Sequence, residues 1–154
     1  MEIDGTPIGN NFPTYFIAEA GLNHNGDVNI AKKIIDAAKN AGANAVKFQT
    51  FQTEKFVTKQ NQYFDIFKNA ELPYSDFNEL NEYSKEKDIT FFSAPFDIES
   101  ADYLNKINVP CFKIASSDLT NIPLIKKIAK MKKPMIISTG ASTMKEVEEA
   151  VNTC

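Results

Sequence analysis

Five short apolar segments alternate with amphipathic segments from Tyr15 to the end of the chain, and this alternation constrains the fold more than any other feature. No low-complexity linker or block of like charges interrupts it. Such an order is typical of parallel α/β proteins, in which a helix follows each strand and returns the chain to the same edge. The predicted strands are residues 15–20, 45–50, 89–94, 111–115 and 135–138.

Polar residues that favour helix starts precede the amphipathic segments. Thr143 and Glu146 have the spacing of a capping box, in which each side chain bonds the backbone N–H of the other residue. Residues 51–73, which lie before a helix expected to begin at Ser75, are predicted to form an elaborated loop. The other expected helix starts are at Asp27, at Asp97 and within 121–123.

The length and the 43% hydrophobic content predict one domain spanning residues 1–154. A five-stranded doubly wound sheet would be complete at this length, and the pattern alone slightly favours it. A closed (β/α)8 barrel needs eight units and about 250 residues, so five units would form part of one. Periodicity by itself does not separate the two folds.

Composition argues against several kinds of partner. The formal net charge is -3 and acids and bases are interleaved, whereas a nucleic-acid site needs clustered basic residues. No apolar segment approaches the length of a membrane span, and we expect a cytoplasmic protein. Cys111 and Cys154 do not suggest a disulfide framework. All basic residues are Lys, so an anion site would use ammonium groups, hydroxyls and backbone N–H groups.

Polar residues gather at the carboxyl ends of the predicted strands, which share one rim in a parallel sheet. Side chains alternate between the two faces of a strand, so Lys47 and Gln49 point to a common face. A buried Lys is costly unless it meets an anion, and Lys47 and Lys113 therefore predict a cradle for phosphate or carboxylate. The candidate residues are Glu19, Lys47, Gln49, Ser93, Lys113, Ser116, Asp118 and Ser138.

Simpler roles remain open for these candidates. Glu19 and Lys47 could form a structural ion pair, and Lys113 could extend to solvent. Gln49 and Asp118 could hydrogen-bond a neighbouring loop or cap a turn. The three serines could serve in turns and near helix starts, where Ser is common.

His24 is the only histidine, and a metal site generally needs several His, Cys or carboxylate ligands. Its expected role in the turn 23–26 is to support the backbone before the helix that follows. The aromatic residues after the second strand are expected to form a satellite core more than a platform for a sugar. They are Phe51, Phe56, Tyr63, Phe64 and Phe67.

Five motifs resemble, in order, successive strand-end motifs of N-acetylneuraminate (sialic acid) synthases. The resemblance covers essentially the whole chain and overturns the slight preference for a doubly wound sheet. It implies an α/β protein with the first five β/α units of a TIM (β/α)8-type barrel. The motifs are IAEAGLNHNG at 17–26, KFQT at 47–50, SAPFD at 93–97, KIASSD at 113–118 and STG at 138–140.

The resemblance implies a transferase that condenses phosphoenolpyruvate with an open-chain N-acetylated amino sugar, such as N-acetylmannosamine, to give a nonulosonic acid and phosphate. By position, Lys47, Lys113, Ser116 and Ser138 would hold the phosphate and carboxylate of phosphoenolpyruvate. Glu19 would lie near the reacting carbons and help the movements of water and protons. Fixed positive charge suits this reaction because it neutralises the substrate and orients its enol carbon.

Gln49 and Asp118 would face the sugar. Ala94 departs from the family pattern, in which Thr is often a phosphate ligand, so that contact would come from Ser93, from the backbone or not at all. The family uses a divalent metal, Mn or Mg, whose histidine ligands lie beyond the fifth unit, as does an arginine of its C-terminal antifreeze-like domain. We therefore expect these 154 residues to be a part of a longer synthase and inactive alone.

Other interpretations stay open. Relatives that make pseudaminic or legionaminic acid, or that serve spore-coat polysaccharide synthesis, share this N-terminal half. A non-catalytic module could keep only the phosphoenolpyruvate cradle or an assembly surface. Unpaired strand edges in a partial barrel would favour a homodimer, because free edges tend to pair with another chain.

Overall fold

The chain folds around a five-stranded parallel sheet, described for residues 1–154 in a computed structural model. Each strand pairs with the next strand along the chain. A doubly wound sheet reverses its strand order in the middle, so this sequential order excludes that alternative. The strands are β3 (Ile17–Glu19), β4 (Ala45–Thr50), β5 (Thr90–Pro95), β6 (Phe112–Ile114) and β7 (Met135–Ile137).

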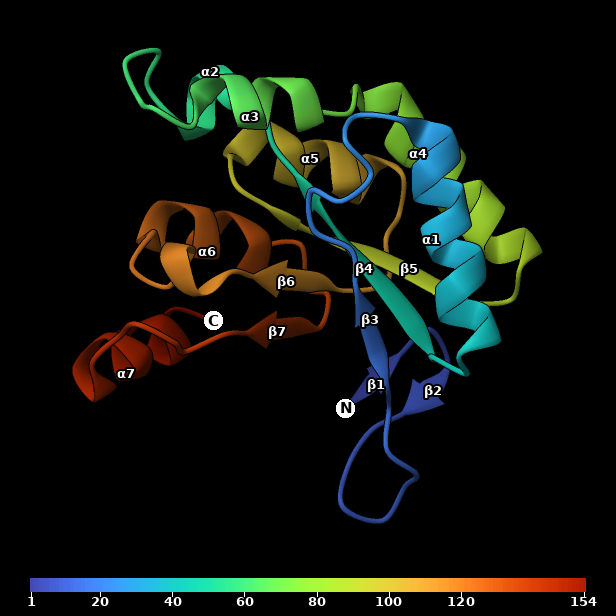
Figure 1. Cartoon of the computed structure of the whole chain (residues 1–154). Helices are drawn as coiled ribbons and strands as arrows, with labels where there is room; N and C mark the ends of the chain where they lie inside the picture. Colours follow the sequence, from blue (N-terminus) through green and yellow to red (C-terminus); the bar gives the residue numbers. More distant parts are fainter.

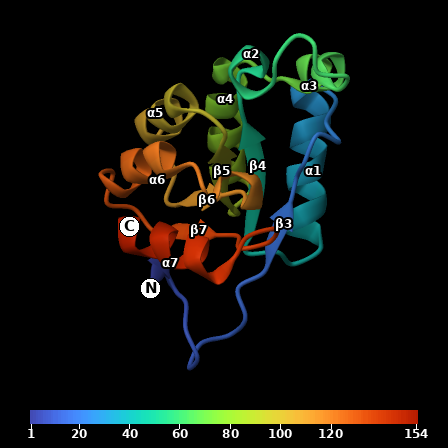
Figure 2. The same cartoon turned by 90° about the vertical axis from the view of Figure 1, so that its left-hand side faces the viewer.

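Helices surround the outside of the curled sheet, and the two views in Figures 1 and 2 show the strands inside this layer. The two edge strands of the sheet, β3 and β7, each pair with only one other strand. The arrangement is a half-barrel with the sequential order and outer helices of a TIM barrel. The principal helices are α1 (Val28–Asn40), α4 (Tyr74–Glu86), α5 (Ile98–Lys106), α6 (Ile122–Ala129) and α7 (Met144–Thr153).

A two-stranded antiparallel hairpin of β1 (Glu2–Ile3) and β2 (Thr6–Pro7) precedes the sheet. Its turn residues Asp4 and Gly5 have φ of 51° and 75°, as a tight hairpin turn requires. Ile3 is fully buried in the main core, and Thr90 Oγ1 donates to Asp4 Oδ2 at 3.0 Å. The hairpin thus packs at the amino end of β5, and periodicity missed it because two-residue strands carry no pattern.

Residues 51–73 were predicted to be a loop, but they contain the short helices α2 (Thr53–Phe56) and α3 (Phe64–Ala70). Their aromatic side chains pack together, with ring centroids 4.7 to 6.2 Å apart. This packing explains why the segment is ordered. The cluster consists of Phe51, Phe56, Phe67 and Phe96.

The satellite core is therefore confirmed for three of the five predicted aromatics. Tyr63 is 52% exposed and Phe64 is half-buried, and neither belongs to the cluster. The capping box of Thr143 and Glu146 is also confirmed, and Asp27 and Asp97 accept hydrogen bonds from the backbone N–H groups of the first turns of their helices.

Neither cysteine is in a disulfide. None of the helices combines the length and apolarity needed to cross a bilayer. A homodimer stays a prediction.

Candidate active site

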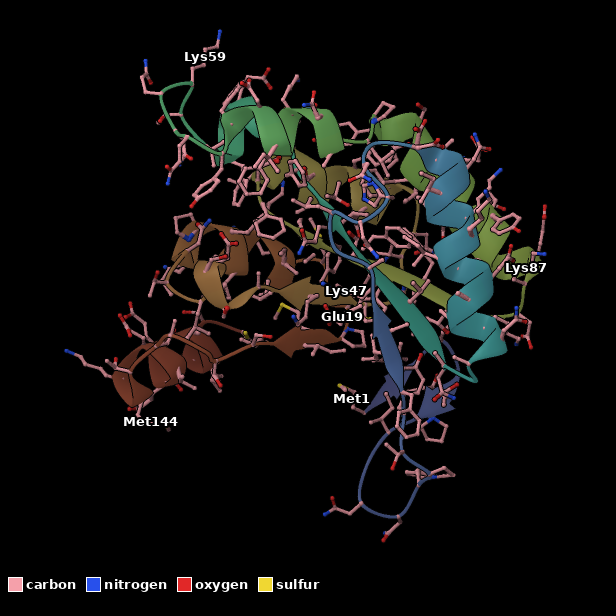
Figure 3. The ribbon with its side chains drawn as sticks, viewed as in Figure 1. Met1, Glu19, Lys47, Lys59, Lys87 and Met144 are labelled. Atoms are coloured by element: carbon pink, nitrogen blue, oxygen red, sulfur yellow. The ribbon has the colours of Figure 1, made fainter.

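Three charged side chains from β3, β4 and β6 lie on the inner face of the half-barrel. Lys47 Nζ lies 2.5 Å from Glu19 Oε2, and the two residues are register partners. Figure 3 shows this pair in the middle of the strand layer. The charges of Glu19 and Lys47 both act on the pKa of Lys113, so the three groups lie within electrostatic reach of one another. The structure thus brings together the ionic residues that the sequence singled out.

The ion pair is unequally buried. The side chain of Lys47 is only 4% exposed, whereas that of Glu19 is 59% exposed. A buried ammonium group needs a partner, and Glu19 supplies it from the open side of the site. The structural ion pair that the sequence left open therefore exists, and the same geometry leaves one face of the Glu19 carboxylate open to a ligand.

Lys113 adds a second positive charge. Burial lowers the pKa of its amine below the ordinary value, Glu19 raises it, and the nearby charge of Lys47 lowers it. Two ammonium groups and one carboxylate leave one net positive charge at this place. A small anion would relieve the repulsion between the two lysines, and charge-assisted hydrogen bonds would hold it.

Gln49 shares the inner face with Lys47, because it lies two residues further along β4. Its register partner is Ala94, and Gln49 is half-buried. Ala94 therefore presents its methyl group to the site. No hydroxyl is available at that position to contact a bound phosphate.

Ser93 was predicted to bind substrate, but it lies on the other face of the sheet, which the helices cover. It is the register partner of Phe48, and its fully buried hydroxyl is 2.7 Å from Thr50 Oγ1. Alternation along the strands turns both hydroxyls toward the helices, away from Lys47 and Gln49. Ser93 thus cannot replace the hydroxyl that Ala94 lacks.

The two remaining candidate serines lie at the carboxyl ends of β6 and β7. Ser138 extends the ladder, since its N–H donates to Ile114 O at 3.1 Å. Ser116 begins a 3₁₀ turn (Ser116–Asp118) and lies next to Gly140, where an added Cβ would be 3.6 Å from Ser116 Cβ. Both serines are half-buried at the rim, and their contacts with substrate stay predictions.

Asp118 is engaged by its own turn. Its Oδ1 accepts from Asn121 Nδ2 at 3.2 Å, and its Oδ2 accepts from Ser117 Oγ at 3.3 Å. Burial raises the pKa of this carboxyl, and the two hydrogen bonds oppose that effect. The geometry favours the simpler local role that the sequence left open, and the contact with the sugar stays a prediction.

His24 supports the turn after β3, as expected. It is buried, its Nδ1 accepts from the Gly26 N–H at 3.2 Å, and its ring lies 6.0 Å from that of Phe48. Burial lowers the pKa of the imidazole. The chain holds no group of three or more His, Cys, Asp or Glu side chains that could bind a metal ion. The side chains of these 154 residues therefore do not form a metal site by themselves.

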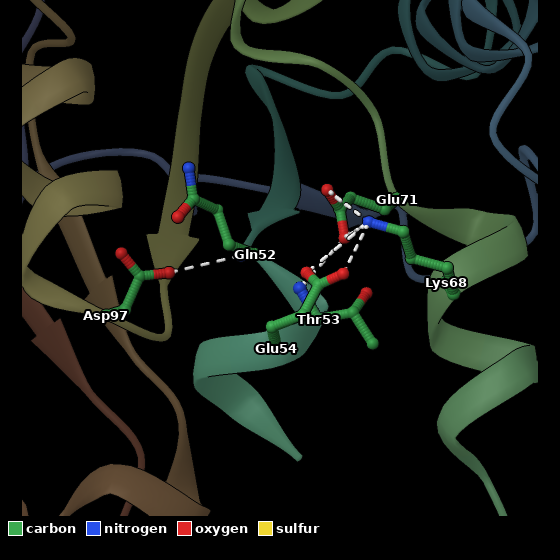
Figure 4. Close-up of polar contacts among 6 residues, drawn as sticks. All are labelled: Gln52, Thr53, Glu54, Lys68, Glu71 and Asp97. Carbon is green, nitrogen blue, oxygen red and sulfur yellow. Dashed lines mark hydrogen bonds and ion pairs between the residues drawn. The ribbon is translucent and has the colours of Figure 1, made fainter. Parts of the chain in front are cut away.

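A polar network that the sequence did not predict lies at the rim. Lys68 lies 3.1 Å from Glu54 and 3.3 Å from Glu71, and Glu71 Oε2 accepts from the Thr53 N–H at 2.8 Å (Figure 4). These bonds close the base of the segment that holds α2 and α3. No local pattern could have found them, because Thr53 and Glu71 are 18 residues apart.

A hollow of about 700 Å³ lies at the opposite end of the strands. It is lined by polar groups that already bond one another, including Lys39 with Asp88 and Thr90 with Asp4. Polar groups that are already hydrogen-bonded to one another do not need a ligand as a partner. Residues at the amino ends of barrel strands generally contribute to the stability of the fold and not to catalysis. The inner face around Lys47, where charged groups remain available to a ligand, is therefore the better candidate.

Residues 34–154 match the NeuB family. A protein of Methanocaldococcus jannaschii without a described function is 51% identical over 98% of this chain and 45% of its own length. The N,N'-diacetyllegionaminic acid synthase of Campylobacter jejuni is 41% identical over 90% of this chain and 46% of its length. The crystal structure of the sialic acid synthetase of Leptospira borgpetersenii, in complex with citrate, superposes with a TM-score of 0.96 at 39% identity, covering 99% of this chain and 54% of that one. The chain spans about half the length of these relatives.

Proposed function

Because this chain belongs to the NeuB family, we propose that it forms the phosphoenolpyruvate-binding part of a synthase that joins this acid to an N-acetylated amino sugar. The observation that carries the proposal is the ion pair of Glu19 and Lys47 with Lys113 on the same inner face, within electrostatic reach. The net positive charge there suits an anion that carries a phosphate and a carboxylate. The citrate complex of the Leptospira relative, which holds a small polycarboxylate, is consistent with such a preference.

In the proposed reaction the lysines orient phosphoenolpyruvate and Glu19 handles protons. The enol carbon bonds to the aldehyde carbon of the sugar, whose C=O opens and whose oxygen takes up a proton to become a hydroxyl. Water adds to the adjacent carbon and gives up a proton, and the C–O bond to phosphate then breaks, leaving a ketone and free phosphate. The bound anion would compete with Glu19 for the Lys47 ammonium. The Glu19 carboxylate, once released from Lys47, could then accept a proton from the attacking water. Because Lys47 is buried, water screens its charge little, and the charge stabilises the bound anion strongly.

Calorimetric titration of phosphoenolpyruvate into the 154-residue chain tests the proposal. We expect weak binding that weakens further with added salt, because the attraction is between charges at a partly open site. The variant Lys113→Met is expected to reduce the affinity about tenfold or more. No heat of binding with the folded wild-type chain would contradict the proposal. Phosphate release from phosphoenolpyruvate with N-acetylmannosamine and manganese is expected only from a full-length synthase.

The affinity for phosphoenolpyruvate is expected to fall as pH rises through the lowered pKa of Lys113. The bound anion raises that pKa, so binding takes up a proton once Lys113 is neutral in the free protein, and the affinity declines above that pH. The ligand itself stays fully ionised there, since a phosphate ester has its second pKa at about 6. Dissociation constants measured through the alkaline range check this, and Lys113→Met should remove the dependence. A wild-type affinity that is flat with pH would refute the role of Lys113.

A further inference from the structure

We propose that Asp97 is a positioning residue, which fixes the end of β4 and therefore Gln49 through a hydrogen bond to the Gln52 backbone. The inference rests on the proposed function, in which Gln49 faces the sugar. Asp97 belongs to the SAPFD motif, and it caps α5 without being one of the candidate substrate-binding residues.

The Asp97 carboxylate extends the ladder between β4 and β5 beyond the ends of both strands. The last register pair is Thr50 with Pro95, and the Phe96 N–H then donates to Thr50 O at 3.0 Å. The next donor on the β4 side, the Gln52 N–H, finds no backbone acceptor and donates to Asp97 Oδ2 at 3.2 Å (Figure 4). The Asp97 side chain thus adds one more hydrogen bond between the two chain segments at the point where their backbones separate toward α2 and α5.

The two oxygens of Asp97 have separate tasks. Oδ1 accepts from the Ser100 N–H at 2.7 Å and caps α5, whereas Oδ2 bonds Ser100 Oγ at 2.7 Å and the Gln52 N–H. Asp97 is 9% exposed, so water competes weakly for these bonds. A second link between α2 and α5, the pair Lys55 and Glu99, lies at the surface, where an ion pair stabilises little.

The hydrogen bond between Asp97 and the Gln52 N–H should affect the position of Gln49 more than that of Lys47. Lys47 is held from its other side, because its carbonyl accepts from the Ala20 N–H at 2.8 Å and its side chain is paired with Glu19. Gln49 lies between that anchor and the end of β4, and β3 ends before it. Loosening the end of β4 should therefore disturb the sugar side of the site and spare the anion cradle.

The variant Asp97→Asn isolates this bond. Asparagine keeps a carbonyl oxygen for the Ser100 N–H and is a good helix cap, but its amide nitrogen cannot accept from the Gln52 N–H. We expect the hydrogen exchange of the Gln52 amide, measured by NMR, to quicken about tenfold or more. With phosphoenolpyruvate saturating, the affinity for N-acetylmannosamine should fall about tenfold, while that for phosphoenolpyruvate changes by less than about twofold.

The control is Ser100→Ala, which removes a hydroxyl bond to the same oxygen and leaves the acceptor for Gln52 in place. It should change neither the exchange of the Gln52 amide nor the ratio of the two affinities. Unchanged exchange in Asp97→Asn, or equal weakening of both ligands, would overturn the inference. If the wild-type chain binds neither ligand, the proposed function fails, while the exchange measurement still decides whether Asp97 holds the end of β4.

Discussion

Replacing Lys47 with methionine is expected to weaken phosphoenolpyruvate binding about a hundredfold or more, because a buried charge that is bonded to an anion typically contributes about 2 to 5 kcal/mol. The Lys47 side chain is 4% exposed, so in the variant water cannot easily replace the ammonium group as a partner of the ligand. Methionine has a similar length and leaves no large cavity. The effect should therefore be on affinity, measured by calorimetry.

The stability of the same variant should be unchanged or higher. Removing a buried ammonium also removes its desolvation cost, and Glu19 is exposed enough to remain solvated when it loses its partner. The matched control is Lys127→Met on α6, which breaks a surface pair with Asp102 at 2.8 Å and should leave binding unaltered. A Lys47→Met protein that is folded and binds phosphoenolpyruvate like wild type would remove Lys47 from the site.

Phe48→Ala is expected to lower the free energy of unfolding by about 3 to 5 kcal/mol, the usual cost of emptying the place of a core aromatic. Phe48 is fully buried on the helix-facing side of β4, with its ring 5.5 Å from that of Phe91 and 6.0 Å from that of His24. Urea unfolding measures the change. The matched control is Phe16→Ala, because Phe16 is 63% exposed and its loss should change stability by no more than about 0.5 kcal/mol. Equal losses in both variants would contradict this assignment of the core.

Local patterns in the sequence determined the five parallel strands and the helices that follow them, but not the hairpin β1–β2 or the short helices α2 and α3. The predicted strand 45–50 coincides with β4, and the predicted helix start at Ser75 is one residue from that of α4. Asp27 and the Thr143–Glu146 pair cap helices as predicted. These features depend on residues within one or two turns of each other, so a single segment contains all the information. Grouping the ionic candidates needed only the rule that parallel strands end at one rim.

Only the tertiary structure decided which strands are neighbours and in which register they pair. It also decided which groups far apart in the sequence form hydrogen bonds. Periodicity could not choose between the doubly wound sheet and the half-barrel, and the family resemblance, not the pattern, favoured the correct one. Ser93 was misplaced because the register that sets it beside Phe48 arises only when β4 and β5 pair. The bond between Gln52 and Asp97 joins residues 45 positions apart. Such contacts form between segments that fold together, and no single segment encodes them.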